Sequence, residues 1–343
     1  MFELIRSVIL WTFCSVYSIV IVLRLCVLYI TKFSSQPWKP KDRPNAPAAL
    51  TDPKYGVHKF ATVNGIRLHY VESGDRTKPL MVFVHGFPEF WYCWRHQIVE
   101  FSKDYWVVAI DMRGYNLSER PSDQQNYEIQ YMVDDLRALI EYLNRKKFIL
   151  VAHDWGALVG WEFVAQNKQM IYKYVMMGAP SSQVFKKLFN SSLDQFKKSW
   201  YILLFQMPIL PELMLSSDDF AGFAAVFNEF FNADDLEAYK YTFSKPGTLS
   251  AGINYYRANF GGASKVQKSD ELDGTDGMFV LGEYERYISM DAIALTAKRY
   301  PKIRVEIVKD ANHFLQQHQS HAVNELLREF LGSPADCSVE ALI

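Results

Sequence analysis

Short runs of consecutive apolar residues alternate along the chain with segments of helical periodicity. Runs typical of strands buried on both faces lie at residues 80–84, 106–110, 148–152, 174–177, 278–281 and 305–308. Helical spacing of apolar residues covers residues 129–143, and a last helix is expected through residues 323–330. Nearer the start, Asn64 and Gly65 separate two apolar segments and predict a β-hairpin turn. Strands separated by helices predict a mostly parallel sheet with helices on both faces.

One long segment interrupts this alternation. Residues 181–270 are rich in Phe, Tyr, Leu and Met, show helical patches and contain no clear strand. We therefore expect an α/β core over residues 57–180, a helical cap inserted over residues 181–270, and a return to the core over residues 271–335. Ligand sites in parallel sheets lie at the carboxyl ends of the strands, and we expect the cap to cover that edge.

The longest apolar run lies near the start of the chain. Residues 7–30 carry one charge, Arg24. A bilayer core of ~30 Å needs about 20 apolar residues in a helix, and a cleaved signal peptide has a shorter apolar core. We therefore expect an N-terminal transmembrane anchor over residues 1–32 and a single-pass protein of the endoplasmic reticulum membrane. Residues 33–56 carry five prolines without apolar periodicity and form a predicted linker.

The orientation of such an anchor stays open. Four basic residues between positions 32 and 43 favour a large domain on the cytosolic side. Two Asn-x-Ser sequons, at Asn116 and Asn190, would be usable only on the luminal side.

Composition excludes several classes of protein. The 343 residues include 37 Lys and Arg against 38 Asp and Glu, and 49% are hydrophobic. A disordered chain would be less apolar and more highly charged. A nucleic-acid-binding protein would need a basic excess, so we expect no nucleic-acid partner. The four cysteines show no metal-binding spacing, and no glycine-rich nucleotide loop occurs, so we expect neither a metal nor a cofactor.

The strongest candidate for chemistry is Asp154. It follows the apolar run at 148–152, precedes a helical segment and has a small residue two positions away on each side, Ala152 and Gly156. These features are typical of a nucleophile elbow, a tight turn from strand to helix that pushes one side chain into a site. A carboxylate in this place can attack an electrophilic carbon and form an ester. A helix-capping Asp is the alternative.

A second candidate segment is the His-Gly-Phe-Pro run at residues 85–88, which follows the strand predicted at 80–84. Gly86 would let the backbone turn, so that the Phe87 N–H faces the site. Together with the Trp155 N–H it would form an oxyanion hole. We expect His85, Gly86, Pro88 and His153 to line the substrate pocket.

The third candidate is His313, just past the last predicted strand, where a general base would be needed. An acid should follow the preceding strand to orient the histidine. Glu283, Glu285 and Asp291 are available there.

Several motifs of this chain resemble those of the α/β-hydrolase-fold epoxide hydrolases, and in particular the membrane-anchored subgroup named epoxide hydrolase 4. The motifs are HGFPEFWYCWRHQ, DMRGYNLSERP, HDWG, a late GExE and NHFLQQ, and the resemblance runs to about residue 331. It implies the α/β-hydrolase fold, with an eight-stranded, mostly parallel sheet and a cap.

The resemblance also implies roles for individual residues. Asp154 would be the nucleophile and His313 the base, with the oxyanion hole as above. Two cap tyrosines, Tyr201 and Tyr256, would bind the epoxide oxygen. The family usually has Asp as the triad acid, whereas this chain has Glu285 at that position.

The expected function is conversion of lipophilic epoxides, such as those of unsaturated fatty acids, to vicinal diols through an Asp ester. Substrate lipophilicity is inferred from the apolar cap and the expected membrane anchor. A haloalkane or haloacid dehalogenase would share the Asp and the His. A catalytically weak protein that binds apolar ligands is a further alternative, motivated by Glu285.

Overall fold

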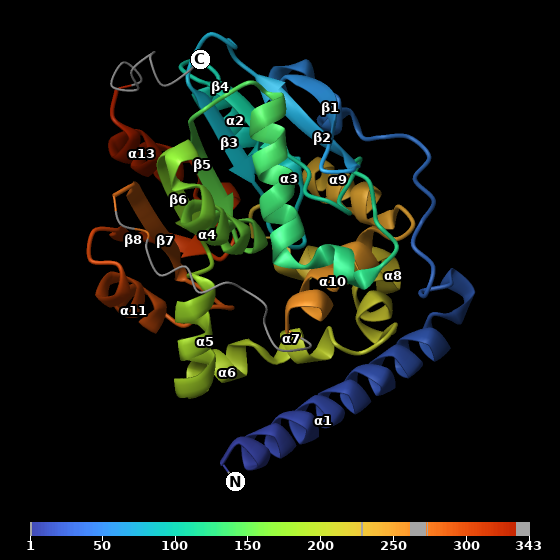
Figure 1. Ribbon diagram of the computed structural model, residues 1–343. Helices are drawn as coiled ribbons and strands as arrows, with labels where there is room; N and C mark the ends of the chain where they lie inside the picture. Colours follow the sequence, from blue (N-terminus) through green and yellow to red (C-terminus); the bar gives the residue numbers. More distant parts are fainter. Residues whose placement is uncertain (1, 228, 261–271, 273, 334–343) are drawn as a thin grey trace.

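The computed structural model describes residues 2–227, 229–260, 272 and 274–333, without the side chains of residues 2–11, 13 and 14. An eight-stranded sheet runs through the centre of this part of the chain (Figure 1). Its order is β1-β2-β4-β3-β5-β6-β7-β8, and every neighbouring pair from β4 to β8 is parallel. The predicted sheet is thereby confirmed. The strands are β1 (Val57–Val63), β2 (Ile66–Ser73), β3 (Leu80–Val84), β4 (Trp106–Ile110), β5 (Phe148–His153), β6 (Ile171–Met177), β7 (Asp276–Tyr284) and β8 (Arg304–Asn312).

The antiparallel part of the sheet is its first hairpin, whose second strand, β2, also pairs antiparallel with β4. β1 pairs with β2, and Val63 lies opposite Ile66 across the predicted turn. Asn64 and Gly65 both have positive φ, of 48° and 76°, as a two-residue hairpin loop requires. The prediction of this turn is confirmed.

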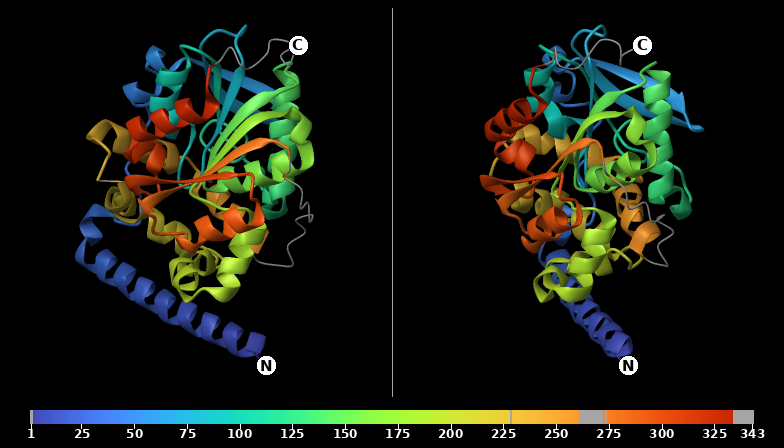
Figure 2. Two further views of the ribbon diagram at one scale, coloured as in Figure 1. Left: turned by 90° about the vertical axis from the view of Figure 1, so that its left-hand side faces the viewer. Right: turned by 60° about the vertical axis from the view of Figure 1, so that its left-hand side comes forward.

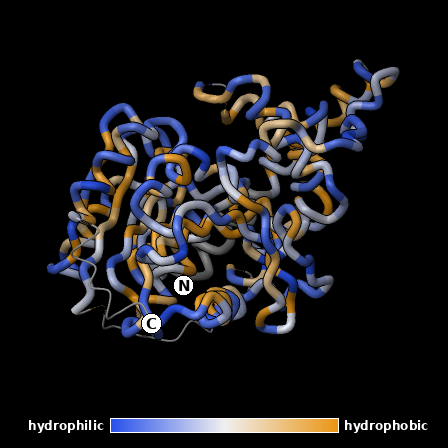
Figure 3. The backbone as a smooth tube through the Cα atoms, turned by 90° about the horizontal axis from the view of Figure 1, so that it is seen from above, coloured by the Kyte–Doolittle hydropathy of each residue, from blue (hydrophilic) through white to orange (hydrophobic). Residues whose placement is uncertain are grey.

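Helices cover both faces of the sheet (Figure 2). Helices α3 and α4 pack together on one face, and α2 and α13 pack together on the other. Every residue of β3, β4 and β5 is buried between these layers, which explains their uninterrupted apolar sequences. Hydrophobic stretches run through the interior of the molecule, and many of the outer turns are hydrophilic (Figure 3). The core helices are α2 (Arg95–Phe101), α3 (Ile129–Tyr142), α4 (Trp155–Asn167), α11 (Asp291–Arg299), α12 (Leu315–His318) and α13 (Ser320–Leu331).

Six helices lie between β6 and β7 in the described residues: α5 (Ser182–Ser191), α6 (Leu193–Lys198), α7 (Trp200–Leu204), α8 (Leu210–Phe227), α9 (Ala233–Ser244) and α10 (Thr248–Phe260). Residues 261–270 of the predicted cap lie outside the described residues. Aromatic rings hold these helices together and to the core. Phe223 of α8 contacts Phe243 of α9, with ring centroids 5.1 Å apart, and Phe227 contacts Phe314 of the core at 4.8 Å. The cap therefore packs directly beside His313.

Helix α1 (Phe2–Thr31) runs along the cap, beside α7 and α8 (Figure 1). The Tyr17 ring lies 5.1 Å from the Trp200 ring, and the buried Ser18 hydroxyl donates to the sulfur of Met207 at 2.8 Å. Among the residues that the structure describes, no helix is long and apolar enough to cross a membrane. The transmembrane helix predicted over residues 1–32 is therefore not found there, and α1 instead packs one face against the protein.

The segment predicted as a linker, residues 33–56, is packed on the cap. Arg43 is 9% exposed, and its guanidinium donates two hydrogen bonds of 2.7 Å to Asp219 of α8 and one of 2.5 Å to Glu237 of α9. Asp219 stands in a kink of α8 where three consecutive residues have positive φ, and the preceding Asp218 N–H donates to the Pro37 carbonyl. The N-terminal segment thus ties two cap helices together.

Candidate active site

Asp154 stands where β5 ends and α4 begins, with φ at 51°, a conformation that residues with a Cβ rarely adopt. The turn is possible because small residues surround it. A Cβ on Gly86 would lie 2.4 Å from the Asp154 Cβ, and one on Gly156 would lie 2.3 Å from the Val84 carbonyl oxygen. The strand, the elbow and the loop after β3 can approach this closely only with glycine at both positions.

Gly156→Ala is expected to lower the free energy of unfolding by at least about 2 kcal/mol, because the added methyl group would meet rigid backbone of β3. Gly222 of α8 is the matched control, since a Cβ there meets nothing within 4 Å. Gly222→Ala should be neutral or stabilising by up to about 1 kcal/mol. Urea unfolding of both variants measures the difference, and equal stabilities would contradict this account of the elbow.

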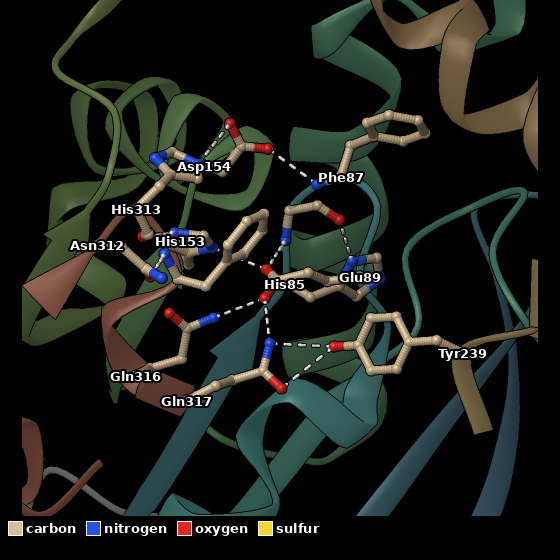
Figure 4. Close-up of polar contacts among 12 residues, drawn as sticks. His85, Phe87, Glu89, His153, Asp154, Tyr239, Asn312, His313, Gln316 and Gln317 are labelled. Carbon is tan, nitrogen blue, oxygen red and sulfur yellow. Dashed lines mark hydrogen bonds and ion pairs between the residues drawn. The ribbon is translucent and has the colours of Figure 1, made fainter. Parts of the chain in front are cut away.

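The Asp154 carboxylate is held between two partners (Figure 4). Its Oδ1 accepts a hydrogen bond of 2.8 Å from the Phe87 N–H, and its Oδ2 lies 3.6 Å from His313 Nε2. Trp155 is the first residue of α4, where backbone N–H groups have no partner within the helix. The two amides predicted to form the oxyanion hole therefore both lie next to Asp154. Burial alone would raise the pKa of Asp154, but His313, the charge of His153 and the Phe87 amide together lower it.

His313 directly follows β8 and lies between two carboxylates. Its Nδ1 is 2.8 Å from Glu285 Oε2, while Nε2 faces Asp154. The Glu285 Oε1 accepts from the Tyr287 and Ile288 N–H groups. Burial alone would lower the pKa of His313, but the charge of Glu285 and the contact with Asp154 outweigh burial and raise it to about 10. The structure thus brings Asp154, His313 and Glu285 into one row, whereas Glu283 instead accepts from the N–H of Asp310.

The two predicted tyrosines come from different cap helices, α7 and α10. The rings of Tyr201 and Tyr256 lie 5.8 Å apart, and the Tyr256 ring also contacts Phe87 and Trp155. Burial, reinforced by the negative charge of Asp154, raises the pKa of both hydroxyl groups well above its usual value. Both hydroxyls therefore stay protonated and can donate hydrogen bonds to a bound molecule near Asp154.

Two residues predicted to line the pocket, His85 and His153, are instead fully buried and bound to other parts of the protein. The buried His85 accepts from the Met112 N–H through Nε2 and donates to the Gly86 carbonyl through Nδ1, so both ring nitrogens are used by backbone. His153 is equally buried, and its ring nitrogens face the Glu89 carboxylate and the His313 carbonyl. The hydrogen bonds of these two histidines join the segments that surround Asp154. Pro88 is half-buried in the loop after β3 and is joined to Phe87 by a cis peptide bond.

Glu89 is a site residue that sequence reasoning missed. It is fully buried and accepts from the side-chain amides of Gln316 and Gln317 and from the Gly86 N–H (Figure 4). Four donors including His153 identify it as an ionised carboxylate. The Glu89 carboxylate and the His313 carbonyl thus hold both ring nitrogens of His153 in place next to Asp154. The sequence did contain a signal for Glu89: it is an acidic residue directly after the His-Gly-Phe-Pro run that follows a buried strand.

No group of His, Cys, Asp or Glu side chains that could hold a metal ion occurs among the residues described. The chemistry available from the side chains present is that of a carboxylate nucleophile with a histidine base and two hydroxyl donors.

Known proteins are similar to this chain in sequence and in architecture. A family model described as alpha/beta hydrolase fold matches residues 79–317. Epoxide hydrolase 4 of Homo sapiens is 34% identical over 344 residues, which cover 95% of this chain and 94% of that protein. Epoxide hydrolase 1 of Caenorhabditis elegans is 38% identical over 283 residues, covering 80% and 70%. The crystal structure of an epoxide hydrolase of Bacillus megaterium in complex with an inhibitor has a TM-score of 0.73 at 30% identity, covering 80% and 99%. This chain therefore belongs to the epoxide hydrolases of the α/β-hydrolase fold.

Proposed function

We propose that this enzyme converts lipophilic epoxides, such as those of unsaturated fatty acids, to vicinal diols through an ester at Asp154. The observation that carries the proposal is the placement of the Asp154 carboxylate between the Phe87 amide and His313, beside two tyrosines. A deprotonated carboxylate next to hydroxyl donors suits the opening of a strained ring, which needs attack at carbon and a proton at oxygen together.

In the first step Tyr201 and Tyr256 bind the epoxide oxygen while Asp154 attacks a ring carbon. The carbon–oxygen bond of the ring breaks, the ester forms, and one tyrosine gives its proton to the new alkoxide. Esterification removes the negative charge of Asp154, which is one of the causes that raise the pKa of His313. The pKa of His313 then falls, and the proton that the imidazole gives up restores the tyrosine hydroxyl.

In the second step neutral His313, oriented by Glu285, takes a proton from water as the water attacks the ester carbonyl. The Phe87 and Trp155 amides stabilise the oxyanion that forms. Collapse of this intermediate expels the diol oxygen, which takes the proton back from His313. The carboxylic acid left at Asp154 then gives its proton to His313, which restores the carboxylate and the protonated imidazole of the free enzyme.

The surroundings of the site favour an apolar substrate. Phe205 of the cap packs against Phe87, with ring centroids 5.7 Å apart, and against Tyr256 at 4.9 Å. Phe260 lies 6.4 Å from Tyr256 on the same helix. Aromatic side chains bind the hydrocarbon part of a substrate favourably and offer few hydrogen-bond partners to polar groups.

Turnover in ¹⁸O water tests this mechanism. The full chain is incubated with an epoxide of oleic acid, and the protein is digested and analysed by mass spectrometry after several turnovers. We expect diol to accumulate and ¹⁸O to enter the peptide that contains Asp154. Diol formed without label at Asp154 would mean direct attack by water and would contradict the ester.

We also propose that the protein works at the surface of the endoplasmic reticulum membrane. The face of α1 that points away from the cap carries exposed apolar side chains at helical spacing: Ile19, Leu23, Val27 and Ile30. An exposed apolar stripe of this kind is typical of helices that lie in a membrane interface. Flotation with phosphatidylcholine vesicles should recover the wild type but not a variant with Ser at these four positions. Equal recovery of both would contradict this role of α1.

A further inference from the structure

A buried glutamine of the cap binds the loop that carries Glu285. Gln195 of α6 is 0% exposed. Its Nε2 donates to the Tyr287 carbonyl at 2.8 Å, and its Oε1 accepts from the Ser289 N–H at 2.8 Å. The amide is therefore used at both ends, on two backbone groups of one loop. Its orientation is fixed, because a carbonyl can only accept and an N–H can only donate.

A second side chain of α6 binds the same loop. Lys198 Nζ donates to the carbonyls of Glu285 and Ile288, both at 3.1 Å. With Gln195, the cap thus occupies four backbone groups between residues 285 and 289. A loop held at so many points keeps one conformation.

This loop determines where the triad acid points. Glu285 Oε1 accepts from the Tyr287 N–H at 2.7 Å, and Oε2 faces His313 Nδ1 at 2.8 Å. The Tyr287 ring contacts the His313 ring at 4.7 Å and the Tyr201 ring at 5.5 Å. A Glu side chain has one more rotatable bond than Asp, so its carboxylate depends more on the backbone groups that hold it.

The cap segment that holds the loop also carries one of the two tyrosines. Helix α6 ends at Lys198 and α7 begins at Trp200, so that Tyr201 follows three residues after Lys198. Figure 1 shows α6 and α7 in succession along the cap. A single stretch of chain therefore connects the epoxide-binding hydroxyl with the acid loop.

We propose that Gln195 is a positioning residue: through the backbone of Tyr287 and Ser289 it holds Glu285 on His313 and couples the cap to the hydrolytic step. This inference rests on the roles proposed above for Glu285 and His313. It predicts that loss of the Gln195 hydrogen bonds impairs ester hydrolysis while ester formation by Asp154 is largely preserved.

The test is Gln195→Met in the full chain, which keeps the volume of the side chain and removes its two hydrogen bonds to the loop, together with a third to the Ser199 hydroxyl. With styrene oxide as the probe, rapid quenching and intact mass spectrometry follow the ester. We expect hydrolysis of the ester to slow by about tenfold or more and its formation to change by less than about twofold. Gln166→Met is the matched control, because Gln166 pairs with Gln130 at the surface of the core and should leave both rates unchanged.

A double variant separates positioning from general stability. Because Gln195 acts through Glu285, Gln195→Met should have little further effect on ester hydrolysis in a Glu285→Gln background. An equal slowing in both backgrounds would overturn the inference. Should Gln195→Met fail to fold, Lys198→Met is the alternative, because Lys198 is partly exposed. This variant removes the two hydrogen bonds of Lys198 to the loop and is expected to slow the same step.

A readout without substrate distinguishes this inference from the proposed function. Nuclear magnetic resonance of ¹⁵N-histidine-labelled protein follows the titration of His313, which is faced by Glu285, Asp154, His153 and the Tyr287 ring. Gln195→Met should lower its midpoint by about one pH unit or more, because Glu285 is less well held. An unchanged midpoint overturns the inference. A wild type that hydrolyses no epoxide, with the midpoint still shifted, refutes the proposed function alone.

Discussion

Asp154→Ala is expected to reduce kcat for epoxide hydrolysis by about 10⁴-fold or more, because the proposed ester forms on this carboxylate. Removing the carboxylate leaves the Phe87 amide and His313 without their shared partner, while His313 keeps its contact with Glu285. Water would then have to attack the ring directly, with the two tyrosines as the remaining assistance. Diol formation, followed by chromatography, measures the loss.

Asp123→Ala is the control for this variant. Asp123 is exposed and directly precedes the short helix at residues 124–127, and its side chain makes no capping hydrogen bond to that helix. Its replacement should leave kcat within about twofold. Diol formation by Asp154→Ala at the wild-type rate, with the fold intact by circular dichroism, would refute the assignment of Asp154 as the nucleophile.

His313→Gln is expected to trap the ester. Ring opening needs Asp154 and the tyrosines, which this variant keeps, whereas the second step loses its base and should slow by about 10²–10⁴-fold. The intact protein should gain the mass of one epoxide within a single turnover and then stall. Absence of any adduct, with normal diol formation, would show that another group activates the water.

The pH dependence of the wild type provides a second check on His313. In the proposed mechanism ester hydrolysis needs the neutral imidazole, so its rate should rise with pH and level off once His313 has lost its proton. Because esterification would remove the Asp154 charge, this midpoint should lie below the pKa of about 10 to which Glu285 and Asp154 raise His313 in the free enzyme. A stopped-flow series from pH 6 to pH 10 measures it, and a rate independent of pH would contradict the assignment.

Much of the core could be predicted from the sequence because its strands are buried on both faces. The apolar runs at 80–84, 106–110 and 148–152 lie in β3, β4 and β5, where layers of helices on both faces of the sheet bury every side chain. The elbow around Asp154 was equally visible, because Gly156 is required by the close approach of β3.

Contacts between distant segments could not be predicted in the same way. Gln195 and Glu285 are 90 positions apart, and nothing local distinguishes a cap glutamine that binds a loop from one that faces solvent. His85 and His153 were expected in the pocket because their sequence neighbours line it. In the structure His85 instead binds backbone groups, and His153 binds the Glu89 carboxylate and the His313 carbonyl. Side-chain direction at a turn depends on the fold around it.

Because Arg43 binds two cap helices, a shortening of the N-terminus that removes Arg43 also changes the cap over the active site. Burial would raise the pKa of Asp219, but the hydrogen bonds from Arg43 outweigh it and lower the pKa to about 2. A protein that begins at residue 45 would leave this carboxylate without its main partner, in a part of α8 whose backbone is already strained. Differences in substrate preference between full-length and truncated enzyme would then report on α8 and α9, and the catalytic row itself would be unaltered.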